Sequence, residues 1–291
     1  MRLLWGLSLL MLFPAAGETA GDESFSSPTN PAFLQYLEGR TSMGTASAGA
    51  SDRPTGYIPP LVDLSHVFRS SSSAGKYRTA TFASSYDLRA LGRVTAVRDQ
   101  GSCGACWAFG AMASMESLLL PGQTWDFSEN NLKNKHGFDW SHCYGGNEIM
   151  SLAYLTRWAG PVLESEDPYN AASGVSPSGL SPSKHLQEAS YISRSDYTDN
   201  DGVKAAIQNY GALYTDMYWS DSYFKSSNNT YYYTGSLGIN HVVSIVGWDD
   251  NFSRNNFTPA ATGDGAFIAR NTFGPSWGDG GYFREIGRAH V

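Results

Sequence analysis

Positive charge, cysteine and long apolar runs are all scarce in this sequence. The 291 residues contain 20 Lys and Arg against 27 Asp and Glu, which gives a net charge of −7. No cluster of Lys or Arg is long enough to follow a phosphate backbone, so nucleic acid is not an expected partner. The apolar stretch at residues 3–13 spans about eleven residues, well short of the ~20 that a membrane-spanning helix requires.

The N-terminus nevertheless has a defined pattern. Arg2 precedes the apolar stretch and small residues follow it, an order typical of a secretory signal peptide. We predict that residues 1–17 are a signal peptide cleaved near Gly17, rather than a retained membrane anchor. The protein is therefore expected to be secreted, periplasmic or extracellular, with no membrane attachment after cleavage, in a compartment where disulfides form.

Between residues 18 and 83, Ser, Gly, Ala, Thr and Pro dominate, and two apolar islands interrupt them, NPAFLQYLEG and PTGYIPPLVDLSHVF. A disordered leader is one interpretation of this composition. Because of the islands, we favour a pro-segment over residues 18–83 that docks in an extended conformation on the domain behind it.

Dense aromatic and aliphatic patterning begins after residue 86. It predicts helices at 106–120, 147–158 and 201–210. Segments rich in β-branched and aromatic residues predict strands at 212–219, 241–248 and 266–270. Residues 249–265 are expected to form a surface loop. Helices followed by strands indicate an α+β domain in two lobes.

The three cysteines are Cys103, Cys106 and Cys143, and their odd number leaves at least one outside any internal disulfide. The close pair Cys103 and Cys106 allows three interpretations: a redox pair, half of a metal site, or a nucleophile beside a structural cysteine. A redox pair usually follows a strand and encloses a proline, whereas here a turn precedes the motif. A zinc site needs four ligands, usually two pairs at short spacing. The sequence offers only His142 and Cys143 as a second pair, which is weak support for a metal site. We expect no metal and no other cofactor.

The third interpretation makes Cys106 a nucleophile at the start of a helix, where free backbone N–H groups and the helix dipole stabilise a thiolate. Such a thiolate needs a histidine to exchange its proton and a group that orients the histidine. His241 opens one apolar strand and Asn271 follows another. Taken alone, a buried histidine is more often a core residue, and an asparagine a turn former.

The segments DFSENNLKNKHGFDW, GYIPPLVDLSH and AGPVLESEDPY resemble the prokaryotic branch of the papain family of cysteine peptidases. Five ordered blocks resemble the family as a whole. They are VTAVRDQGSCGACWAF, FSENNL, CYGGN, NHVVSIVGW and RNTFGPSWGDGGYFR. The resemblance spans roughly residues 84–284 and implies an α+β fold with a helical N-terminal lobe, a β-rich C-terminal lobe and an active-site cleft between them. It also implies a secreted endopeptidase, made as a zymogen, whose partners are polypeptide substrates and its own pro-segment. We expect a monomer.

The resemblance implies a role for each matched residue of the catalytic site. Cys106 attacks the scissile carbonyl, and His241 holds the proton and delivers it to the leaving amine. Asn271 orients the imidazole. Gln100 and the backbone N–H of Cys106 stabilise the oxyanion.

Further roles follow from the same resemblance. Gly145 and Gly146 pair with the substrate backbone, which approaches closely because glycine has no Cβ. Trp277 lines the leaving-group side of the cleft. The family pattern also implies a disulfide between Cys103 and Cys143.

Among the departures from the family pattern, two bear on the site and on the domain boundary. Phe273 stands where a tryptophan usually shields the Asn/His pair. Residues 286–291 can be produced by translating a common sequencing adapter, so we expect the peptidase domain to cover residues 84–285 and to be truncated there. Two alternatives to hydrolysis stay open: an inactive relative that serves as a binding or adhesion protein, and a peptide ligase or transpeptidase that uses the same residues.

Overall fold

The computed structural model describes residues 29–43, 54–63 and 81–286, apart from 193, 195 and 197. The predicted signal peptide and residues 287–291 lie outside this part. The helices are α1 (Pro31–Met43), α4 (Cys106–Leu119), α5 (Glu129–Lys135), α6 (Glu148–Thr156) and α7 (Asp201–Tyr210), with the 3₁₀ turns Asp221–Tyr223 and Arg254–Asn256. The strands are β1 (Ser85–Asp87), β2 (Leu213–Met217), β3 (Phe224–Lys225), β4 (Thr230–Tyr231), β5 (His241–Asp249), β6 (Ala266–Arg270) and β7 (Tyr282–Glu285).

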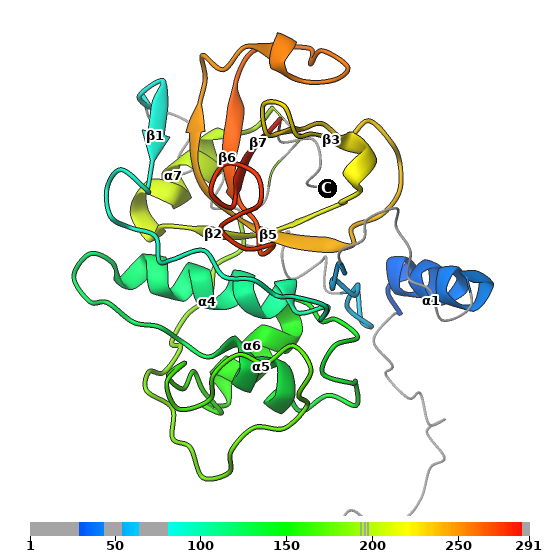
Figure 1. Cartoon of the computed structure of the whole chain (residues 1–291), viewed down its shortest axis with the longest axis vertical. Coiled ribbons are helices and arrows are strands. Elements are labelled where there is room, and N and C mark those ends of the chain that lie inside the picture. Colours follow the sequence, from blue (N-terminus) through cyan, green and yellow to red (C-terminus); the bar gives the residue numbers. More distant parts are fainter. Residues whose placement is uncertain are drawn as a thin grey trace, which may run out of the picture.

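Helices α4, α5 and α6 lie in a different half of the domain from the strands, whereas α7 packs against the sheet (Figure 1). Helices α4, α5 and α6 form one half, and the strands form a sheet in the other, in the order β1-β5-β6-β7-β4-β3 with β2 also paired to β5. The strand pairs are antiparallel except β4 with β7. The predicted two-lobed α+β architecture is confirmed. The predicted helices correspond to α4, α6 and α7, and the predicted strands to β2, β5 and β6.

Strand β5 is the centre of the sheet, and its sequence explains why. Every residue of β5 except Asp249 is buried, which is typical of an apolar run covered on both faces. One of its edges pairs with β2 and then with β1, while the other pairs with β6. Val242 packs into the core of the helical half and Val243 into the core of the sheet half. The two halves therefore meet along β5.

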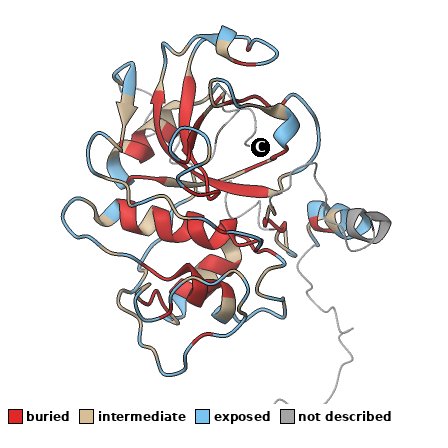
Figure 2. Cartoon of the chain, viewed as in Figure 1, coloured by how far each residue is buried: buried red, intermediate tan, exposed pale blue. Residues whose placement is uncertain are grey.

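Helix α4 lies against β5 and is mostly buried, as Figure 2 shows. Gly110 permits this close contact, because a Cβ there would lie 2.7 Å from Cγ1 of Val242 and 3.0 Å from Cδ2 of Tyr214. The helix begins at Cys106 and the strand begins at His241. The packing of α4 on β5 brings these two elements together at the cleft.

The N-terminal island NPAFLQYLEG lies in α1, so its expected extended conformation is wrong. Its sequence contains a helix start: the Asn30 side chain accepts the backbone N–H of Ala32 (3.0 Å), and Pro31 takes the first helical position. The backbone N–H of Asn30 donates to the carbonyl of Leu61 (2.9 Å). This contact ties α1 to the second island.

The expected loop after β5 carries the 3₁₀ turn Arg254–Asn256 and a small core of its own. Phe257 and Ala261 are buried there against Tyr232, so the loop is anchored to the sheet half. Of the helices in the described ranges, none combines the length and the apolar character that crossing a membrane requires.

Candidate active site

Cys106 is a free, fully buried thiol at the first position of α4. The backbone N–H groups of Trp107, Val242 and Gly56 lie close enough to its sulfur to lower the pKa of the thiol, against the larger effect of burial. Val242 follows His241 in β5, so the predicted nucleophile and base come from adjoining ends of two packed elements.

The other two cysteines are joined. Cys103 and Cys143 form a disulfide with Cα atoms 4.7 Å apart. The backbone N–H of Gly104 donates to the carbonyl of Cys143 (3.3 Å), and a Cβ on Gly104 would lie 2.8 Å from that oxygen. The turn before Cys106 is thus held against the loop that carries Gly145 and Gly146.

His241 is buried, and Nε2 of its imidazole lies 2.8 Å from Oδ1 of Asn271. The same Oδ1 accepts the backbone N–H of Thr272 (2.8 Å), which identifies it as the oxygen of the amide. Because an oxygen can only accept, Nε2 carries the imidazole hydrogen. Nδ1 is then a free base, and it has no hydrogen-bond partner among the described residues.

Aromatic rings enclose the imidazole. Phe273 stacks on His241 with ring centres 5.1 Å apart, and Trp219 lies 5.9 Å from it. Trp277 contacts Phe273 edge to face at 5.5 Å. The Asn240 side chain holds Trp219 through two hydrogen bonds, from the Trp219 N–H (2.6 Å) and to the Trp219 carbonyl (2.9 Å).

Gln100 is fully buried and all its polar groups are engaged. Its Nε2 donates to the carbonyls of Cys103 (2.8 Å) and Pro54 (2.7 Å). Its Oε1 accepts the hydroxyl of Thr272, and its backbone N–H donates to the Thr272 carbonyl (2.8 Å). The carbonyl of Pro54 therefore accepts a hydrogen bond from the Gln100 side-chain amide, which is the group predicted to donate to an oxyanion.

Residues 54–63 run in an extended conformation along the cleft, and we call them the covering segment. The N–H of Gly146 donates to the carbonyl of Gly56 (2.9 Å), and the N–H of Ile58 donates to the carbonyl of Gly146 (3.0 Å). The pairing is parallel. Gly145 also needs to be glycine, with φ of +116° and a Cβ position 2.5 Å from the Gly56 carbonyl.

Cys106 and His241 are both completely buried under the covering segment. Burial raises the pKa of Cys106 to about 12 and lowers the pKa of His241 to about 4. Both shifts favour the uncharged form, so the covered site holds a neutral thiol and a neutral imidazole at pH 7.

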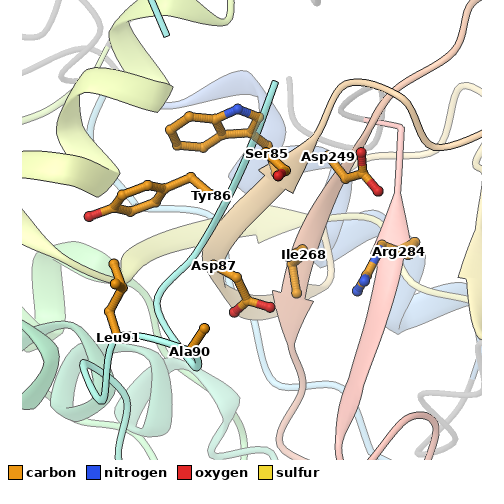
Figure 3. A pocket seen from close by; sticks show the side chains of 9 residues that line it. Ser85, Tyr86, Asp87, Ala90, Leu91, Asp249, Ile268 and Arg284 are labelled. Atoms are coloured by element: carbon orange, nitrogen blue, oxygen red, sulfur yellow. The ribbon is translucent and has the colours of Figure 1, made fainter. Parts of the chain in front are cut away.

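A hollow of about 410 Å³ lies elsewhere, among β1, β5, β6 and β7 (Figure 3). Asp87 and Arg284 face it on either side of Ile268. It contains none of the predicted site residues. Residues of the covering segment lie in the predicted cleft, in contact with Gly146, Asn240 and Gln100.

In the part of the chain that the structure describes, no group of three or more His, Cys, Asp or Glu side chains is arranged to hold a metal ion. The site is instead assembled from Gln100, Cys106, His241 and Asn271. The profile of the family described as "Papain family cysteine protease" matches residues 82–290. The chain belongs to this papain family.

Curated relatives include plant, mite and viral cysteine proteases. Cysteine proteinase EP-B 1 of Hordeum vulgare is 30% identical over 216 residues, covering 69% of this chain and 53% of the relative. The chain thus spans about half the length of this curated relative.

Solved structures of papain-family proteins share the fold. The cysteine protease and lectin-like domains of Cwp84, a surface layer associated protein of Clostridium difficile, match with a TM-score of 0.70 and 28% identity, over 90% of this chain and 57% of that one. A variant of the clostridial cysteine protease Cwp84 after propeptide cleavage matches with a TM-score of 0.59 and 29% identity, over 71% and 54%. The likeness to Cwp84 supports the prokaryotic branch of the papain family.

Three features around this papain-family site were not predicted. Trp219 and Asn240 were missed, although Asn240 directly precedes His241 in the sequence. The covering segment was predicted to dock on the domain, but not where. Its contacts with Gln100 and Gly146 join segments far apart in the sequence, so the local sequence of residues 54–58 does not predict them.

Proposed function

We propose that this protein is a thiol-dependent endopeptidase that is made as an inactive precursor. The observation that carries the proposal is the unpartnered Nδ1 of the His241 imidazole. The other ring nitrogen, Nε2, is fixed by Asn271. Val242, which follows His241 in β5, brings its backbone N–H close to the Cys106 sulfur. A base with one nitrogen oriented and the other free, beside a thiol at a helix N-terminus, is the arrangement that nucleophilic catalysis requires.

The chemistry proceeds in two stages. Nδ1 of His241 takes the thiol proton, and the Cys106 sulfur attacks the substrate carbonyl carbon. The negative charge that forms on the carbonyl oxygen is stabilised by the Gln100 amide and the backbone N–H of Cys106. Collapse expels the amine, which takes the proton from His241 and leaves a thioester. Water, deprotonated by His241, then attacks the thioester, releases the acid and restores the thiol.

The covering segment keeps the precursor inactive in this proposal. It occupies the oxyanion donor of Gln100, pairs with Gly146 and faces the sulfur with the N–H of Gly56. We place it within a pro-segment of residues 18–83. Cleavage of a propeptide in the related Cwp84 supports its removal here.

An extracellular or periplasmic location fits the same proposal. The Arg2-led apolar N-terminus is typical of export, and a disulfide such as Cys103–Cys143 persists in oxidising compartments. Cwp84 is described as a surface layer associated protein, which is consistent with this location.

The test compares the full chain, activated by limited proteolysis, with the same preparation of Cys106→Ala. A mixture of fluorogenic peptides reports cleavage, and an epoxysuccinyl thiol inhibitor reports the nucleophile. We expect the wild type to be labelled at Cys106 and to cleave peptides, and the variant to lose ~10⁴-fold or more of this activity. Equal cleavage by the two proteins would remove Cys106 as the nucleophile.

A further inference from the structure

Tyr57 of the covering segment takes a defined position beside Gly146. Its two chain neighbours, Gly56 and Ile58, form the backbone hydrogen bonds to Gly146. Its own N–H donates to the carbonyl of Asn240 (3.0 Å), so both walls of the cleft hold it. A substrate residue that pairs with Gly146 directs its side chain to the space that Tyr57 fills.

The Tyr57 side chain, which is 8% exposed, ends among acidic and phenolic groups. Its hydroxyl is hydrogen-bonded to Glu148, at the start of α6, and interacts electrostatically with Asp216 of β2. Tyr191 and Tyr214 are the other phenols in this electrostatic cluster. We call Glu148, Asp216, Tyr191 and Tyr214 the Tyr57 site.

Glu148 is the group that distinguishes this site from an apolar pocket. Its Oε2 is shielded from solvent and has no hydrogen-bond partner in the described ranges. Burial raises the pKa of Glu148, and no lysine or arginine among the described residues is a cause of its shift. A shielded carboxyl oxygen without a donor is costly, and a donating or cationic side chain from a ligand removes that cost.

We infer that the Tyr57 site is a specificity pocket for lysine or arginine, with Glu148 as the specificity-determining residue and Asp216 as a second acidic group. The inference rests on the proposed function and names its substrate class: peptides with a basic residue at the position that pairs with Gly146. Asp216 adds to the negative character of the site, because it interacts with Glu148.

The chemistry of the present occupant supports a basic substrate residue. Tyr57 supplies one donor to Glu148, whereas lysine and arginine have a similar reach and several donors, together with a positive charge. Charge-assisted hydrogen bonds to a carboxylate are about twice as strong as neutral ones. Norleucine or phenylalanine at this substrate position would leave the Glu148 carboxyl buried and without a donor.

The first experiment uses the activated full chain and a peptide library randomised at each position near the cleaved bond. Matched peptides that differ only at the selected position then carry lysine, arginine, tyrosine, phenylalanine or norleucine. We expect kcat/KM to be at least tenfold higher with lysine or arginine than with norleucine. Glu148→Gln should lower the value at least tenfold for the basic peptides and less than threefold for norleucine.

The control is Glu166→Gln. Glu166 is exposed and accepts the backbone N–H of Leu163, and the amide oxygen of the substituted side chain can still accept this hydrogen bond. It should leave the preference unchanged. Cys106-dependent cleavage with no basic preference overturns the inference but not the proposed function, and so does a basic preference that survives Glu148→Gln. Absence of Cys106-dependent cleavage of every peptide overturns the proposed function.

A second experiment tests the Tyr57 site without catalysis. In the full-length precursor, Tyr57→Lys should keep Cys106 as slow to react with iodoacetamide as in the wild type, because the lysine pairs with Glu148. Tyr57→Leu should raise the rate at least tenfold. Equal rates for these two variants would overturn the inference, whatever the outcome of the peptide assays.

Discussion

The two walls of the cleft position their key residues by different means. On the helical wall, the start of α4, the preceding turn and the nearby disulfide fix Cys106. On the sheet wall, side chains fix His241: the Asn271 amide and the rings of Phe273 and Trp219. The nucleophile is therefore held through its backbone and a disulfide, and the base through non-covalent side-chain contacts.

The covering segment bonds to groups of both walls and to the oxyanion donor. It meets Gly146 and Gln100 on the helical side and Asn240 on the sheet side. Substitutions in this segment should therefore alter the exposure of both walls. A substitution in the helical wall should mainly change stability, and one in the sheet wall should mainly change catalysis.

The largest effect is expected from Gly56→Ala in the full chain. A Cβ there would lie 2.2 Å from the carbonyl oxygen of Gly104, so the covering segment must leave. At pH 7 a thiol with a pKa of about 12 is ionised to ~1 part in 10⁵, against ~3% for an ordinary cysteine.

Uncovering therefore raises the rate of iodoacetamide alkylation at Cys106 about 10³-fold at pH 7, and moves the midpoint of its pH profile downward. Mass spectrometry of the Cys106 peptide measures both, and Leu61→Ala, at an exposed position of the same segment, is the control. Similar rates for Gly56→Ala and the wild type would show that the segment does not protect the thiol.

The next effect concerns the helical wall alone. Replacing Cys103 and Cys143 together by serine opens a loop of 40 residues, and the chain-entropy relation gives a loss of ~4 kcal/mol in the free energy of unfolding. Urea denaturation measures the loss, and the control is Cys106→Ala, which keeps the disulfide and removes the free thiol. A midpoint equal to that of the control would mean that hydrogen bonds such as Gly104 to Cys143 suffice to hold the turn.

Asn271→Ala tests the sheet wall. Asn271 holds the imidazole without being proposed to touch the substrate, so kcat should fall about 10²-fold with KM nearly unchanged. The hydrogen bond to Asn271 raises the pKa of His241 against the effect of burial, so its removal moves the ionisation of His241 to lower pH. A rise in KM with unchanged kcat would instead assign Asn271 to substrate binding.

The difference between the walls also explains what the sequence could predict. Helix α4 and strand β5 follow from local patterns, because each is a mostly apolar segment with a turn or glycine before its start. The candidates Cys106, His241, Asn271 and Gln100 come from ordered motifs, and the structure brings them to one cleft.

Contacts between distant segments could not be predicted in the same way. Asp216 is a lone acid in an aromatic strand, which is a signal of a polar site, but its proximity to Glu148 depends on how β2 and α6 pack across the cleft. The island NPAFLQYLEG was expected to be extended, but it begins with a helix-start signal. Asn30 caps the helix and Pro31 takes the first position of α1. Trp219 lies beside His241, where Asn240 holds its backbone and Tyr231 stacks on its ring.

The smallest effect is expected where the two walls meet, at Gly110. Alanine favours helices over glycine by ~1 kcal/mol, yet its Cβ would lie 2.7 Å from Val242 and 3.0 Å from Tyr214, both on the sheet wall. Overpacking typically costs ~1–3 kcal/mol, so Gly110→Ala should lower the free energy of unfolding by ~1 kcal/mol. Gly202→Ala in α7 is the matched control, because the nearest atom to its Cβ is 3.5 Å away, and it should be neutral or slightly stabilising. If both variants gain stability in thermal denaturation, α4 can move away from β5, and the close contact between the walls is not what sets the position of Cys106.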